Sequence, residues 1–169
     1  YWYGRALAEM GYVVIAPDVG QHTLQHTNWS LMGERTWDAL RCVDYLVTLP
    51  EVDASRLGVA GLSLGGEMAM WLGAMDQRIY GTSSCGFLTK MDQMKEGHCM
   101  CWKFDGLREL ADFSDVYSLI APRPLQCQNG MSEPQRESGD SVAGETRPSS
   151  DLSAETVNVP TGSTPASSE

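Results

Sequence analysis

The sequence has little of what several special classes of protein require. Its five cysteines are too few, and odd in number, for a disulfide scaffold. No apolar run approaches the ~18 residues that a membrane-spanning helix needs, so we expect no membrane insertion. Basic residues are in the minority, with 12 against 22 acidic residues and a net charge of −10. Such a chain repels a phosphate backbone, which argues against nucleic-acid binding.

The overall composition, with 42% hydrophobic and 20% charged residues, is typical of one globular domain. The last 35 residues differ, because they hold eight serines, four threonines and three prolines but no aromatic residue. A segment of that composition buries too little apolar surface to offset its ordering entropy. We therefore predict a domain over residues 1–134 and a disordered Ser/Thr/Pro/Glu-rich tail over residues 135–169.

Apolar periodicity predicts alternating helices and strands within the domain. The predicted strands cover residues 12–16, 56–60, 79–88 and 124–128, and the predicted helices cover residues 2–10, 31–49 and 67–75, with one more near 107–112. This alternation is typical of an α/β protein with a parallel sheet flanked by helices. Four strands are few for a complete sheet, and the chain opens inside a helical run. We therefore expect an incomplete piece of such a fold.

One motif carries chemistry. Gly61-Leu62-Ser63-Leu64-Gly65-Gly66 has the form G-x-S-x-G and lies between a predicted strand and a predicted helix. In that context the sharp turn exposes the Ser63 hydroxyl, and the Leu64 backbone N–H points at the carbonyl under attack. A phosphate-binding turn is the alternative, but Glu67 stands where a P-loop would have lysine. The motif therefore predicts a nucleophile elbow.

The stretch from Asp53 to Gly66 resembles the elbow region of α/β-hydrolases, in particular the dienelactone-hydrolase-like and acetyl (xylan) esterase-like branch. The later run Leu119–Leu125, followed by Gln128-Asn129-Gly130, is similar to the segment that precedes the catalytic acid in that branch. The resemblance implies a partial α/β-hydrolase fold over about residues 2–134. It also implies a serine carboxylic-ester hydrolase without a cofactor, acting on a small-molecule or carbohydrate ester through an acyl-enzyme at Ser63.

The rest of the catalytic machinery is incomplete in the sequence. In this fold the order along the chain is serine, acid, histidine. Glu133 lies where the resemblance places the acid, but no histidine follows it. His98 precedes the last predicted strand, so it would serve as the base only in a rearranged triad. We therefore expect this chain alone to be weakly active or inactive; a frameshifted end or a divergent tail would each explain the missing histidine.

Other reactive side chains point to less specific roles. His98 lies beside Cys99 and Cys101, but this C-x-C run lacks the four ligands of a structural zinc site, so we expect no bound metal. Trp29, Trp37 and Trp102 suit either a sugar-binding cleft or ordinary packing. The sequence does not indicate an oligomeric state or a cellular compartment.

Three hypotheses follow. The first is a fragment of a serine esterase with Ser63 as nucleophile, Leu64 N–H as half of the oxyanion hole and Glu133 as the acid. The second is a non-catalytic binding module of α/β-hydrolase type, which the missing histidine favours and the intact elbow does not. The third is a serine peptidase of the prolyl oligopeptidase kind, whose elbow is similar; the Ile120–Pro124 stretch and the absence of a propeller domain favour the esterase.

Overall fold

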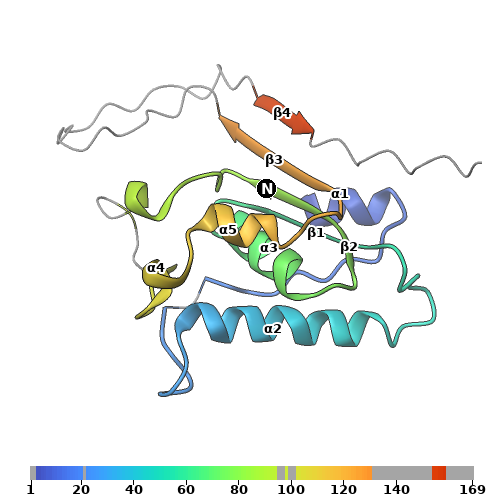
Figure 1. The fold of residues 1–169 in the computed structure, drawn as a ribbon. Coiled ribbons are helices and arrows are strands. Elements are labelled where there is room, and N and C mark those ends of the chain that lie inside the picture. Colours follow the sequence, from blue (N-terminus) through green and yellow to red (C-terminus); the bar gives the residue numbers. More distant parts are fainter. Residues whose placement is uncertain (1–2, 21, 95–97, 99–101, 131–153, 159–169) are drawn as a thin grey trace, which may run out of the picture.

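The computed structural model describes residues 3–20, 22–94, 98, 102–130 and 154–158. Helices separate the successive strands between residues 57 and 130 (Figure 1). The helices are α1 (Tyr3–Glu9), α2 (Leu31–Leu46), α3 (Leu64–Met75), α4 (Leu107–Leu110) and α5 (Phe113–Ser118), with a 3-10 turn, η1, over Met91–Met94. The strands are β1 (Leu57–Leu62), β2 (Ile79–Cys85), β3 (Leu125–Gly130) and β4 (Ala154–Asn158).

The strands form a sheet in the order β1-β2-β3-β4. β1, β2 and β3 are parallel, and β4 runs antiparallel to β3. The register pairs Leu62 with Cys85, and Cys85 with Gln128. The C-terminal ends of the three parallel strands therefore meet at one edge of the sheet, which is where ligands bind in open α/β sheets.

Helix α3 packs against both the sheet and two other helices. It contacts β1 and β2 on one side and also packs against α2 and α5 (Figure 1). Its sequence LGGEMAMWLGAM is apolar around most of its circumference, as expected for a helix that is covered on several sides. The main core cluster includes Met70, Phe113 and Ile120, which are fully buried, and a second cluster around Val43 and Ile79 joins α2 to the sheet.

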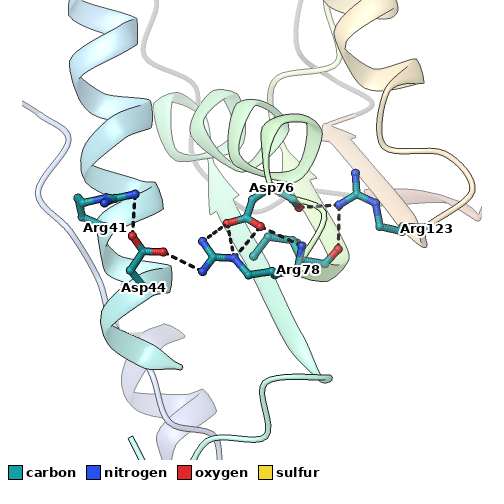
Figure 2. A network of polar contacts seen from close by, with 6 residues as sticks. Arg41, Asp44, Asp76, Arg78 and Arg123 are labelled. Carbon is teal, nitrogen blue, oxygen red and sulfur yellow. Dashed lines mark hydrogen bonds and ion pairs between the residues drawn. The ribbon is translucent and has the colours of Figure 1, made fainter. Parts of the chain in front are cut away.

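A network of arginines and aspartates lies at the C-terminal end of α3 (Figure 2). The Asp76 carboxylate accepts hydrogen bonds from the Arg78 guanidinium, which also bridges to Asp44 of α2 at 2.7 Å. Arg123 donates to the carbonyl oxygens of Asp76 and Ile79 at 2.8 and 2.9 Å. Hydrogen bonds from Arg78 hold the pKa of Asp76 below its usual value. The arginine of the Ile120–Pro124 stretch therefore secures the start of β2.

Most predicted elements are confirmed with small shifts of their ends, but the predicted strand over residues 12–16 is wrong. These residues form no strand, and Val13, Val14 and Ile15 are each more than a third exposed. Their β-branched composition favours extended backbone, but a strand also requires a neighbour that completes its hydrogen bonds. In the described part of the chain, the strand pairs are those of β1 to β4 and none includes residues 12–16.

The segment predicted as a disordered tail is described over residues 154–158 alone, and these form β4. The rest of that prediction lies outside the described residues. Residues 113–118, where no element is predicted above, form α5, and Asp112 and Asp115 form its capping box. Among the described residues, no helix is both long enough and apolar enough to cross a bilayer.

Candidate active site

Ser63 occupies a strained turn between β1 and α3. Its φ and ψ are 57° and −116°, and it is the one non-glycine residue with positive φ in the described part of the chain. Such backbone costs of order 1–3 kcal/mol and persists only where the surroundings impose it. The residue is exposed, so the strain presents its hydroxyl at the C-terminal edge of the sheet.

Two glycines make this turn possible. A Cβ on Gly61 would lie 2.0 Å from the carbonyl oxygen of Gly65, so the strand and the helix approach too closely for any side chain. A Cβ on Gly66 would lie 2.4 Å from the carbonyl oxygen of Cys85, which brings α3 directly against β2. The Ser63 N–H donates to that same Cys85 carbonyl at 2.8 Å. The turn is thereby fixed to the neighbouring strand.

The N-terminus of α3 has electrostatic features that favour a nearby anion. Leu64 is its first residue, and first-turn N–H groups have no acceptor within their own helix. The aligned peptide dipoles of α3 place partial positive charge at this end. An anion that forms on an acyl group attached at Ser63 would meet both features.

Two buried hydroxyl groups, those of Ser84 and Tyr117, form hydrogen bonds next to the first turn of α3. The Ser84 hydroxyl, fully buried on β2, donates to the Gly66 carbonyl at 2.9 Å and lies 2.7 Å from the Tyr117 hydroxyl. Tyr117 of α5 also donates to the Phe87 carbonyl at 3.3 Å. Burial raises the pKa of Tyr117 to about 12, so this hydroxyl stays a neutral donor at physiological pH.

Glu67 adds an ionisable group to the same turn. Its side chain is 2% exposed, and its N–H donates to the Ser63 carbonyl at 3.0 Å. Burial raises the pKa of Glu67 to about 7, while the Trp71 indole and the Arg35 guanidinium act in the opposite direction. Glu67, Ser84 and Tyr117 were not among the site residues predicted from the sequence. A single carboxyl inside an otherwise apolar helix was the signal for Glu67, but the other two depend on strand register and helix packing.

Among the described residues, no histidine side chain forms a hydrogen bond with Ser63. Glu133, Cys99 and Cys101 lie outside the described residues. His98 is an exposed residue in a bend, and the ring of His26 packs on Trp29 with centroids 5.3 Å apart. Within the described ranges, no three histidine, cysteine or acidic side chains form a group that could hold a metal ion.

The three tryptophans lie in two different environments. Trp102 is buried and packs edge-on against Phe113, so it belongs to the core. Trp29 and Trp37 are partly exposed, and they line a hollow of about 470 Å³ between α2 and α3. The lining of this hollow is mainly apolar and includes neither Ser63 nor Leu64. It is therefore separate from the serine turn.

The parallel sheet, the strand–turn–helix at Ser63 and the helix layer define a partial α/β-hydrolase fold. The family comparison narrows this class: the model of the prolyl oligopeptidase family matches residues 2–112, and the chain belongs to that family. The expected superfamily is thereby confirmed, and the serine-hydrolase type agrees with it.

Individual relatives match this chain over part of their length. The chain is 31% identical over 103 residues to the protein YtaP of Bacillus subtilis, and 37% identical over 84 residues to Dipeptidyl-peptidase 5 of Porphyromonas gingivalis. These matches cover 57% and 46% of this chain but 33% and 12% of the relatives. A glucuronoyl esterase structure from Solibacter usitatus matches 66% of this chain and 33% of its own, with 28% identity and a TM-score of 0.47. The chain thus spans a third or less of each.

Proposed function

We propose that the protein is a serine hydrolase that cleaves carboxylic esters through an acyl-enzyme on Ser63. The observation that carries this proposal is the strained, exposed Ser63 at the junction of β1 and α3. A binding protein gains nothing from this strain, whereas a nucleophile gains access to its substrate. The Leu64 N–H and the α3 N-terminus then stabilise the oxyanion.

The proposed steps balance as an acyl transfer. Ser63 Oγ forms a bond to the acyl carbon as its proton passes to a base, and the alcohol leaves with a proton. Water then releases the acid and restores the serine. Glu133 remains the sequence-based candidate for the carboxylate that orients the base. Because no histidine follows Glu133 in the sequence, we propose that this chain alone turns over slowly.

A serine peptidase is the second candidate function, favoured by the family and by the resemblance to Dipeptidyl-peptidase 5. The two activities differ in their demand on the leaving group. An amine must be protonated as it departs, whereas an activated alkoxide leaves with less help from a general acid. The stretch Asp53–Gly66, which resembles the elbow of the acetyl esterase-like branch, supports esters as the proposed substrate class.

Chemical rescue tests this proposal. Imidazole added to the solution replaces a missing histidine, and we expect it to promote hydrolysis of p-nitrophenyl acetate by the chain, with the Ser63→Ala variant as background. Hydrolysis of a peptide p-nitroanilide should be at least about tenfold slower. The exposed Ser55 provides the matched control, because Ser55→Ala should keep full activity.

Each alternative gives a different result in this assay. Equal or faster cleavage of the peptide amide would identify a peptidase. Rates equal to those of Ser63→Ala with both substrates would contradict a catalytic serine and favour a binding module.

A further inference from the structure

The buried carboxyl of Glu67 lies one helical turn after the proposed nucleophile. It is on the same first turn of α3 that presents Ser63 and Leu64, and its N–H bonds to the Ser63 carbonyl. Its side chain is almost fully buried between α3 and its neighbours. Burial of an ionised carboxyl costs free energy unless a counter-charge or hydrogen bonds stabilise it. The proposed steps of ester hydrolysis assign Glu67 no role.

The groups that face Glu67 stabilise its negative charge only in part. Among the described residues, Arg35 from α2 attracts its negative form, and Tyr117 from α5 lies close enough for the charge to act on its hydroxyl. The Trp71 indole lies near the carboxyl without hydrogen-bond geometry, so Glu67 Oε1 and Trp71 Nε1 both lack a partner there. Both charge states of Glu67 are therefore accessible near neutral pH.

The two states act differently on the serine turn. A neutral Glu67 leaves the positive end of the α3 dipole unopposed at the Leu64 N–H. An ionised Glu67 adds a negative charge about one turn away, in a region shielded from water, where charges interact more strongly than in bulk solvent. That charge opposes any anion that forms at position 63.

We propose that Glu67 is a positioning residue that sets the electrostatic potential at the Ser63 turn, so that anion formation there is favoured when its carboxyl is neutral and opposed when it is ionised. The inference deepens the proposed function, because the anions concerned are the serine alkoxide and the oxyanion. Glu67 does not touch the substrate; it acts through the Leu64 N–H and the helix dipole.

A thiol placed at position 63 measures this potential without any catalytic base. Thiolate formation is sensitive to a helix N-terminus, and the thiolate is the reactive form. The alkylation rate of position 63 is followed by peptide mass spectrometry in the full chain carrying Ser63→Cys, with or without Glu67→Gln. Resolving the peptides keeps the native cysteines out of the measurement. Glu51→Gln, which removes an exposed carboxyl, is the matched control.

The two variants should react equally at about pH 5.5, where Glu67 is neutral, and the Glu67→Gln form should react about fivefold faster at about pH 8. A rate ratio that is constant across this range would overturn the proposal. Should the double variant not fold, the Ser63→Cys profile alone decides: a departure from a single titration near neutral pH supports the proposal, and a single titration contradicts it. The result is independent of ester hydrolysis, whose failure would appear in the imidazole assay.

Discussion

Gly61→Ala will lower the free energy of unfolding by about 3 kcal/mol or more, because the new Cβ meets backbone rather than a movable side chain. It would stand 2.0 Å from the Gly65 carbonyl oxygen. Gly66→Ala should have a similar effect, since its Cβ would stand 2.4 Å from the Cys85 carbonyl oxygen. Relief of either contact requires α3 to move away from the sheet, and the Ser63 turn would open with it.

Gly81→Ala on β2 is the matched control, because a Cβ there meets nothing within 4 Å. Urea unfolding followed by circular dichroism compares the three variants with the unaltered chain. The Gly81 variant should lie within about 0.5 kcal/mol of it. If Gly61→Ala were as stable as Gly81→Ala, the close approach of β1 and α3 would be wrong.

Glu67→Gln will change how stability depends on pH, by about 3 kcal/mol between acid and neutral solution. The carboxyl has a pKa of about 7 in the folded state and of about 4.5 in a model compound. The folded state therefore binds this proton more tightly than the unfolded state does. Stability is greatest below the lower value and falls as the pH rises toward the higher one. The glutamine variant carries no such titration.

The measurement is urea unfolding of both forms at about pH 5 and about pH 8. The glutamine variant should gain about 2.5 kcal/mol relative to the unaltered chain as the pH rises from about 5 to about 8. Glu51→Gln, at an exposed position, should follow the unaltered chain throughout. A difference between the Glu67 variant and the unaltered chain that is the same at both pH values would show that the carboxyl ionises normally.

The serine turn was the most predictable part of the molecule. Glycines two residues before and after Ser63, between a short apolar run and an apolar helix, specify this geometry locally, and the structure has it. The strand over residues 12–16 failed for the opposite reason. Its composition is local information, but a strand depends on a neighbour, and no described strand pairs with it.

The buried polar contacts next to the serine turn could not be predicted from the sequence. Ser84 and Tyr117 are separated by 33 positions and meet only because β2 and α5 both pack on α3. Glu67 is visible in the sequence as a single carboxyl in an apolar helix, but an exposed first-turn acid that favours the helix dipole has the same pattern. Only the packing of α2 against α3 shows that it is buried beside Arg35.

The central claim is that Ser63 is a nucleophile, and covalent labelling tests it most directly. The chain is treated with a fluorophosphonate in the presence of imidazole, and the modified serine is located by peptide mass spectrometry. We predict that Ser63 is labelled at least about tenfold faster than the exposed Ser55, and that Ser63→Ala removes the fast label. Labelling of Ser63 no faster than Ser55 would contradict the account.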